Sequence, residues 1–537
     1  MRLLYSLIVL SALTAFATGL PHPARGGELR MAIHSEPKSL DPHLASEADS
    51  ELVAYLTHGV LIRIDRQTQR PQAELAASWK VRPDGKEIRF LLRPGLKFSD
   101  GSALAASDVC FSIQRILDPA LDSPFGDSLR AASGKIRCTA TGASVSISFE
   151  RALPSPERWW DSIAILKEAA PVQDRVGLGP FTVAEWQSGT QILLRRNERY
   201  WKKDAAGRNL PYLDAIRLQI QRNREVELLR FSRGELDLIQ GLDAERYTRL
   251  QEQQPQALRG LGASLDSEQM WFNQVPQSPL PAYKKSWYAN PAFRQGISAA
   301  IHREDLAKVV YKGQATPATG PISPMNRAWA HPALLPQPGD PHKALSLLGA
   351  AGFQKTGDTL YDSEQHPVEF TVLTNAGNKN RERMLSLIQQ DLLAIGVKLK
   401  PVTLDFPALI ERITKTYDYD ACLLGMVIGN PDPNEFLNVL MSSAATHQWN
   451  PNQKTPATPW EAEIDSLLQA QAGEPDVAKR KKAWWRIQEI LATQQPFLYL
   501  VHPNAMAAVA SRVQGIRPVV LRPQLLWNAE WLSLDPQ

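Results

Sequence analysis

Residues 195–214, RRNERYWKKDAAGRNLPYLD, place six basic and three aromatic side chains in one short segment. A nucleic-acid groove, a membrane-binding patch and a surface loop between strands all fit this composition. The flanking residues separate these possibilities. Residues 179–186 and 191–195 alternate apolar and polar side chains around the turn signal Ser188-Gly189, and residues 213–220 continue with strand character. The segment therefore lies between predicted strands.

The basic side chains of this segment do not form a continuous surface. Three acidic residues interrupt them: Glu198, Asp204 and Asp214. Binding of single-stranded nucleic acid needs a basic groove in which aromatic side chains are free to stack. Residues 205–209 instead have the composition of a turn, and we expect Tyr200 and Trp201 to pack beneath it. The sequence predicts an aromatic-anchored loop and no nucleic-acid partner.

The bulk composition agrees with that exclusion. A chain of 537 residues is too long for one hydrophobic core and predicts two or three lobes. Its 60 Lys and Arg residues against 56 Asp and Glu residues give a net charge of +4. So small an excess provides no global field to hold a polyanion.

The N-terminal segment is predicted to direct export. Arg2 precedes the apolar residues 3–13, and Ala15-Phe16-Ala17 fits a signal-peptide cleavage site, so residues 1–17 are predicted to be removed. No other segment approaches the ~18 apolar residues of a membrane span. No cysteine lies near the cleavage site to carry a lipid. A protein without an anchor needs an outer membrane to retain it, which predicts a periplasmic location.

The three cysteines are Cys110, Cys138 and Cys422. Their odd number requires at least one thiol that is free or intermolecular. In an oxidising compartment Cys110 and Cys138 form a disulfide, or both are small buried residues. The sequence leaves these two alternatives open.

Helix and strand patterns alternate along the chain. Residues 366–374 alternate as a strand, residues 378–395 carry a helical apolar stripe that ends before Gly396, and residues 397–402 alternate again. This order predicts a parallel strand pair with a helical crossover. Further signals predict a helix from Pro291, a hairpin at Asp84-Gly85, a helix through residues 484–491 and a strand over 497–501. The fold class is therefore α/β.

The segment 195–214 also resembles a sequence block of the family 5 extracellular solute-binding proteins, the large receptors of oligopeptide and dipeptide ATP-binding cassette importers. Other collinear blocks are similar too: residues 29–43, 71–101, 106–119, 271–273, 292–304 and 343–353. The resemblance implies a class II periplasmic binding protein fold, in which two lobes close over a ligand and an extra domain is inserted.

The resemblance also implies how the chain is divided. Lobe I is expected to contain residues 28–63, 180–263 and 505–537. The inserted domain is expected over residues 64–179, and lobe II over residues 264–504. The implied partners are a small solute or peptide and the permease subunits of the importer. The receptor is expected to be monomeric, without a cofactor, a bound metal or catalytic residues.

The resemblance places the ligand site near Asp432-Pro433. In dipeptide-type members a carboxylate three residues before this pair holds the ligand's amino terminus, and a Trp stands just upstream. Here Gly429 and Met426 occupy those positions. A buried ammonium without a paired charge costs several kcal/mol, so the departure leaves the ligand open. The expected ligand-binding residues are Met426, Gly429, Asn430, Asp432, His447, Trp449 and Trp271.

Two other functions have some support in the residues. Ser35 to Lys38, Tyr288 to Asn290 and Lys355 to Gly357 match the three short motifs of penicillin-recognising serine enzymes. Pro37 and the Ser-Leu-Asp-Pro turn after it disfavour the helix that this chemistry needs. Binding of a metal chelate or haem is the alternative within the family, although no histidine pair has ligand spacing.

Overall fold

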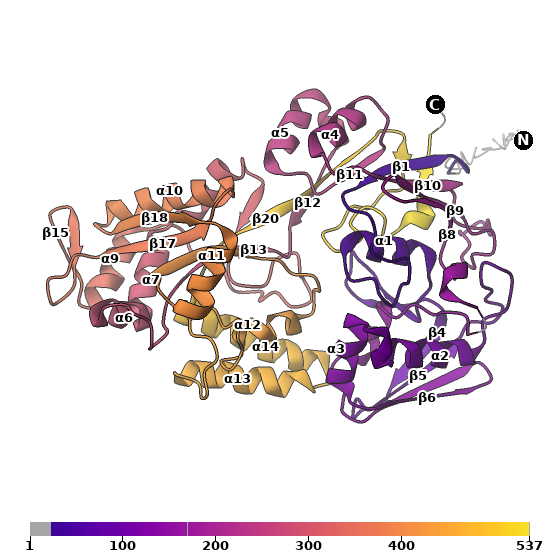
Figure 1. Cartoon of the computed structure of the whole chain (residues 1–537), viewed down its shortest axis with the longest axis horizontal. Helices are drawn as coiled ribbons and strands as arrows, with labels where there is room; N and C mark the ends of the chain where they lie inside the picture. The colour runs from indigo at the N-terminus through magenta and orange to yellow at the C-terminus, as the bar shows by residue number, and fades with distance from the viewer. Residues whose placement is uncertain (1–22, 169, 536–537) are drawn as a thin grey trace, which may run out of the picture.

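A computed structural model describes residues 23–168 and 170–535 of the chain. Two masses lie side by side along the long axis of the molecule, with the N-terminal half of the chain mainly in one and residues 264–504 in the other (Figure 1). We keep the names lobe I, inserted domain and lobe II for the residue ranges predicted above. The predicted signal peptide, residues 1–17, lies outside the described residues.

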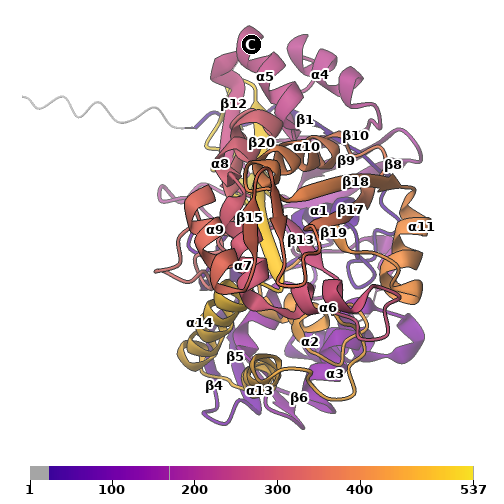
Figure 2. The ribbon, with the colours of Figure 1, turned by 90° about the vertical axis from the view of Figure 1, so that its left-hand side faces the viewer.

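One sheet of twelve strands extends through both lobes. Its order is β18-β17-β19-β13-β20-β11-β1-β10-β9-β8, and β12 and β14 also pair with β20. The long strand β20 (Phe497–Val509) joins the two halves and runs through the middle of the molecule in both views (Figure 1, Figure 2). The predicted strand over 497–501 is therefore the first part of a longer one. The predicted boundary between residues 504 and 505 falls inside it.

Lobe I surrounds the second part of β20. The predicted hairpin around Ser188-Gly189 is confirmed as the antiparallel pair β8–β9, and β10 pairs in parallel with β1. The elements of lobe I are β1 (Glu28–Ile33), α1 (Ala48–Thr57), β2 (Ile62–Ile64), β8 (Phe181–Gln187), β9 (Gln191–Arg196), β10 (Ala215–Ile220), α4 (Arg224–Ser232), β11 (Leu238–Gln240), α5 (Ala244–Gln253), η4 (Pro255–Ala257), β12 (Leu258–Ala263), β21 (Val513–Gln514), η8 (Ala529–Trp531) and β22 (Ser533–Leu534).

The loop between β9 and β10 has the predicted structure. Tyr200, Leu210 and Tyr212 are buried in a small cluster of their own, against which Trp201 packs. The surface charges of the loop pair locally, because Arg208 Nε donates to Asp204 Oδ2 at 2.6 Å and Arg196 Nη2 lies 2.8 Å from Asp214 Oδ1. Two of the six basic residues, Arg196 and Arg208, are therefore neutralised within the loop.

The inserted domain has its own four-stranded sheet and its own hydrophobic core. The predicted turn at Asp84-Gly85 connects its antiparallel strands β4 and β5. A disulfide joins Cys110 of α2 to Cys138 of β6, with the Cα atoms 5.4 Å apart, which decides the alternative that the sequence left open. The elements are β3 (Pro71–Ala73), β4 (Ala76–Val81), β5 (Glu87–Leu92), α2 (Ala106–Leu117), η1 (Pro119–Leu121), α3 (Pro124–Ser133), β6 (Ile136–Thr141), β7 (Ser144–Phe149), η2 (Pro156–Asp161) and η3 (Val172–Asp174).

Lobe II contains the predicted strand–helix–strand unit. The strands β17 and β18 pair in parallel, and Asn378 caps the N-terminus of the helix between them. The elements are β13 (Ser267–Phe272), α6 (Ala282–Ala289), α7 (Pro291–Ala300), α8 (Arg303–Asp305), η5 (Leu306–Val310), β14 (Ala315–Pro317), α9 (Pro341–Ala350), β15 (Gln354–Thr356), β16 (Thr359–Tyr361), β17 (Glu369–Asn375), α10 (Lys379–Ala394), β18 (Lys398–Leu404), α11 (Phe406–Glu411), η6 (Arg412–Thr416), β19 (Ala421–Met426), η7 (Pro433–Phe436), α12 (Leu437–Leu440), α13 (Pro459–Ala472) and α14 (Val477–Gln494).

The helix predicted from Pro291 is α7, which Asn290 caps, and the apolar stripe of residues 484–491 lies on α14. Among residues 23–168 and 170–535, no helix combines the length and the apolar character needed to cross a bilayer. The architecture confirms the predicted α/β fold of two lobes with an additional domain.

Candidate ligand-binding site

The strand directions place a candidate site between the lobes. Lobe II strands pair with the first part of β20, and β17, β18 and β19 run in the direction of β20 toward lobe I. Lobe I strands pair with its second part, and β1 and β10 run the opposite way. The carboxyl ends of the two parallel sets therefore point toward each other. Ligands of open α/β sheets bind at these ends, and we call this region the interlobe face.

The loop after β19 gives lobe II an open part of this face. Met426 is half-buried, whereas Gly429 and Asn430 are exposed. A Cβ atom added at Gly429 would meet no heavy atom within 4 Å. Ile428 N donates to Asp266 Oδ1 at 2.9 Å, which ties the loop to the segment joining the lobes. Three of the predicted ligand-binding residues thus lie together on one accessible loop, and their contact with a ligand stays a prediction.

Asp432 is held by protein rather than left for a ligand. Its two carboxylate oxygens accept from the guanidinium of Arg480 at 2.9 and 3.0 Å, and Oδ1 also accepts from Asn434 N. Arg480 is fully buried on α14 and also donates to Gln471. The guanidinium of Arg480 therefore neutralises the Asp432 carboxylate, which leaves it poorly placed to pair with a ligand ammonium.

The same arginine connects the two sides of the molecule. Arg480 Nη1 donates to Ser155 Oγ of the inserted domain at 2.9 Å. Nearby, Gln69 of the β2–β3 turn donates to Met325 O at 2.8 Å and accepts from Ala328 N at 3.2 Å in lobe II. Figure 1 shows α13 and α14 beside α3 on this side. The structure is therefore a state in which the inserted domain touches lobe II.

The three remaining predicted residues lie in the core of lobe II. Trp271, His447 and Trp449 have relative exposures of 0%, 0% and 1%. Trp271 Nε1 donates to Tyr419 Oη at 3.2 Å, and Trp449 Nε1 donates to Glu461 Oε1 at 2.9 Å. In this conformation their side chains offer no surface to a ligand. The sequence order placed them near the site, but their side chains point into the protein.

Glu461 organises this buried cluster. Burial alone would raise the pKa of Glu461, but side-chain hydrogen bonds from His447, Gln453, Trp449 and Thr458 together lower it to about 2. The sequence Thr-Pro-Trp-Glu at 458–461 has the spacing of a helix capping box, and Thr458 Oγ1 donates to Glu461 Oε2 at 2.8 Å. This spacing is a sequence signal for the start of the helix.

On the lobe I side, a polar cluster follows β1. His34 Nε2 lies 3.1 Å from Glu227 Oε1, and Arg224 contacts both residues. Burial, followed by the charge of Arg224, lowers the pKa of His34 to about 4, whereas burial raises the pKa of Glu227 to about 7. Ser35 Oγ donates to Asp49 Oδ2 at 2.7 Å. No local sequence pattern predicts this cluster, because about 190 residues separate His34 from Arg224 and Glu227.

The motifs of the serine-enzyme alternative are not assembled. Ser35 follows β1 in lobe I, and Lys355 lies on β15 at the far end of lobe II, where its Nζ donates to Ala394 O (Figure 1). Tyr288 is buried, and its hydroxyl donates to Asp420. Within the described part of the chain, no group of three or more His, Cys, Asp or Glu residues is placed to hold a metal ion.

Comparison with known proteins identifies relatives that are all named as binding proteins. The model of "Bacterial extracellular solute-binding proteins, family 5 Middle" matches residues 70–448. The chain is similar to the oligopeptide-binding protein AppA of Bacillus subtilis, with 24% identity over 95% of this chain and 92% of AppA. It is also similar to haem-binding protein A of Haemophilus influenzae, with 26% identity over 85% of this chain and 83% of the relative.

A solved structure shares the fold. The ABC transporter substrate-binding protein CtaP of Listeria monocytogenes aligns with a TM-score of 0.76 and 21% identity, covering 95% of this chain and 100% of CtaP. The family match covers more than half of the 537 residues. This chain belongs to the family 5 bacterial extracellular solute-binding proteins.

Proposed function

We propose that this protein is the substrate-binding component of an ABC importer, and that it binds a peptide or peptide-like solute at the interlobe face. The observation that carries the proposal is the shared strand β20, across which the carboxyl ends of two parallel strand sets point toward each other in a chain of this family. Closure of two lobes encloses a ligand, and the binding free energy offsets the cost of closing.

The proposal includes a location and a partner. Export by the predicted signal peptide suits a periplasmic receptor, which delivers its ligand to membrane permease subunits. No chemistry is assigned to the protein. Its expected selectivity is for solutes that need no carboxylate at position 429, because Gly429 stands there and Arg480 already neutralises Asp432. Peptides with a modified amino terminus fit this condition.

A peptide-capture experiment tests the proposal. The purified protein is incubated with a mixed library of free and N-acetylated short peptides, and mass spectrometry identifies those that remain bound after desalting. We expect selective enrichment of peptides, with N-acetylated members retained. Gly429→Arg is expected to abolish the enrichment, because an added Cβ atom meets no heavy atom within 4 Å there and the long side chain would fill part of the interlobe face.

Gly349→Arg is the matched control. Gly349 lies exposed on α9, and an added Cβ atom there also meets no heavy atom within 4 Å. This variant is expected to enrich the same peptides as the unmodified protein. Enrichment that survives Gly429→Arg would place the ligand elsewhere. Failure to enrich any peptide would contradict the proposed ligand class.

Haem or a metal chelate is the second candidate ligand, favoured by the similarity to haem-binding protein A. The same assay includes haem and nickel–histidine as additional probes. If the protein retains haem or nickel–histidine with a stoichiometry near one, and Gly429→Arg does not, that compound replaces the peptide as the ligand of the interlobe face.

A further inference from the structure

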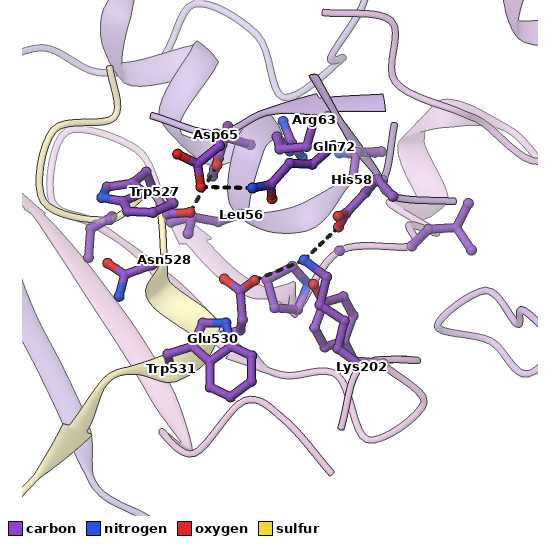
Figure 3. Close-up of a pocket in the computed structure, with 18 of the residues that line it drawn as sticks. Leu56, His58, Arg63, Asp65, Gln72, Lys202, Trp527, Asn528, Glu530 and Trp531 are labelled. Atoms are coloured by element: carbon purple, nitrogen blue, oxygen red, sulfur yellow. Dashed lines mark hydrogen bonds and ion pairs between the residues drawn. The ribbon is translucent and has the colours of Figure 1, made fainter. Parts of the chain in front are cut away.

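A cavity lies within lobe I and the adjoining β2–β3 hairpin. Its volume is about 320 Å³, and none of its lining residues belongs to lobe II. Its walls come from the end of α1, the β2–β3 hairpin, the loop at residues 200–202 and the C-terminal segment 517–531 (Figure 3). Four aromatic side chains line it: Tyr55, Tyr200, Trp527 and Trp531. Small-molecule sites typically have volumes of about 300–1,000 Å³ and aromatic walls with a few polar groups.

One side of the cavity has surplus negative charge. Lys202 Nζ lies 2.9 Å from Glu74 Oε1 and 3.0 Å from Glu530 Oε1, so one ammonium faces two carboxylates. Glu74 and Glu530 are buried, with exposures of 7% and 8%. Within the described ranges, the second oxygen of each carboxylate, Oε2, accepts no hydrogen bond from a side chain or backbone group. Neither oxygen is a fully buried atom without a partner, so both are accessible, and an accessible carboxylate oxygen favours a cationic donor.

The opposite side of the cavity presents a guanidinium. The Arg63 Cζ atom lies 4.0 Å from the centre of the Tyr55 ring, and Figure 3 shows Arg63 and Glu530 on opposite sides. The ionic contact of Arg63 is Nη1 to Asp161 Oδ1 at 3.5 Å, and Asp161 is shared with Arg66 at 2.7 Å. Among the residues that the structure describes, the Arg63 side chain donates no hydrogen bond, whereas Arg66 donates to three acceptors. Arg63 thus retains the forked donor face that binds carboxylates.

The lining charges balance in number, and Lys202 contacts both Glu74 and Glu530. The cations are Arg63, Lys202 and Arg517, and the anions are Asp65, Glu74 and Glu530. Asp65 is engaged by its own turn, because it accepts from Thr68 N and Gln72 Nε2. A simple anion would satisfy Arg63 but meet the surplus carboxylate, and a simple cation would do the reverse. A molecule that carries both charges satisfies both sides.

We propose that this cavity binds a small zwitterion of the α-amino acid class. Its carboxylate pairs with Arg63, its ammonium group lies against the free oxygens of Glu74 and Glu530, and its apolar side chain contacts the tryptophan walls. The site is separate from the interlobe face and does not rest on the peptide proposal.

Three matched probes test this site by isothermal titration calorimetry. L-phenylalanine carries both charges, phenethylamine only the ammonium, and 3-phenylpropionate only the carboxylate. We expect L-phenylalanine to bind at least about tenfold more tightly than either single-charge probe, because each lost contact is a charge-assisted hydrogen bond. Gly429→Arg, which blocks the interlobe face, is expected to retain this binding.

Two variants assign the charges. Arg63→Gln is expected to lower the affinity for L-phenylalanine and 3-phenylpropionate by about tenfold or more and to leave the affinity for phenethylamine unchanged. Glu530→Gln is expected to weaken L-phenylalanine and phenethylamine while leaving 3-phenylpropionate unchanged. Arg137→Gln removes the same charge from an exposed position on β6 and serves as the control that changes none of them. Circular dichroism melting verifies that each variant is folded.

Several outcomes would overturn the assignment. One is the absence of saturable L-phenylalanine binding at concentrations up to about 1 mM, because a dissociation constant above about 1 mM would be too weak for a specific site. Another is equal affinity for the three probes. Binding that disappears in Gly429→Arg but persists in Arg63→Gln would assign the amino acid to the interlobe face instead.

Discussion

At the scale of single residues, Asp432 shows how a residue at the expected ligand position acquires a structural role. Its carboxylate neutralises Arg480, which is fully buried and also contacts Ser155 in the inserted domain. Removal of one partner of a buried ion pair leaves an uncompensated charge and typically costs about 3–5 kcal/mol.

Asp432→Ala is therefore expected to lower the free energy of unfolding by about 3–5 kcal/mol in chemical denaturation. Asp418→Ala is the control, because Asp418 and Arg412 form an exposed pair with side-chain exposures of 58% and 46%. Exposed pairs contribute about 0–1 kcal/mol. Equal, small losses of unfolding free energy in the two variants would show that the buried charge of Arg480 does not need Asp432 as its partner.

The three cysteines give a second prediction at this scale. Cys110 and Cys138 form a disulfide, and Cys422 is a buried free thiol. A thiol reagent is expected to find no reactive group in the folded protein, one after unfolding, and three after unfolding with reduction. The double substitution C110S/C138S is expected to destabilise the inserted domain by about 3.6 kcal/mol, because the bond closes a loop with a sequence separation of 28 residues. Two reactive thiols or more in the unfolded, unreduced protein would contradict this pairing.

At the scale of elements, the N-terminus of α13 depends on an ionised Glu461. Its folded-state pKa of about 2 lies below its ordinary value of 4.5. The stabilisation is therefore complete above about pH 4.5 and is lost as the pH falls toward 2, with a total of about 3 kcal/mol.

Glu461→Gln is expected to flatten the dependence of unfolding free energy on pH between those values, as measured by denaturation at a series of pH values. Glu463→Gln alters an exposed carboxylate of the same helix and is expected to leave the dependence nearly unchanged. If the unfolding free energy of Glu461→Gln still falls steeply with decreasing pH, the acid sensitivity belongs to other groups.

Local periodicity predicted the elements well where side chains alternate or form stripes. The unit β17–α10–β18 was predicted in its order and in its parallel pairing, since strand and helix periods differ clearly there. The second part of β20, residues 502–509, was not predicted because Pro503 and Asn504 disfavour a strand and the small residues after them give no clear alternation. Its strand structure depends on pairing with β11 and β12, which sequence patterns do not reveal.

The candidate site was less predictable than the fold. The resemblance located the loop after β19. The sequence does not show, however, whether an aromatic side chain there faces a ligand or the core. Trp449 and His447 are buried because they bond to Glu461, which follows them by 12 and 14 residues. The cluster of His34 and Glu227 forms only when β1 and α4 come together in the fold.

At the scale of the whole molecule, the described state has contacts between the inserted domain and lobe II. The shared strand β20 and the segment at residues 264–266 connect the lobes, so they are the expected hinge. Hinge closure around a ligand is the usual motion of binding proteins with this architecture. Opening requires the hydrogen bonds of Arg480 to Ser155 and of Gln69 to lobe II to break.

Pulsed electron paramagnetic resonance between the lobes tests the account most directly. Spin labels are placed at S128C on α3 and S466C on α13, two exposed positions on the sides that meet in this structure. A captured peptide at saturation is expected to convert a broad, longer distance distribution into one shorter, narrower population. The same distribution with and without bound peptide would contradict a receptor that closes around its ligand.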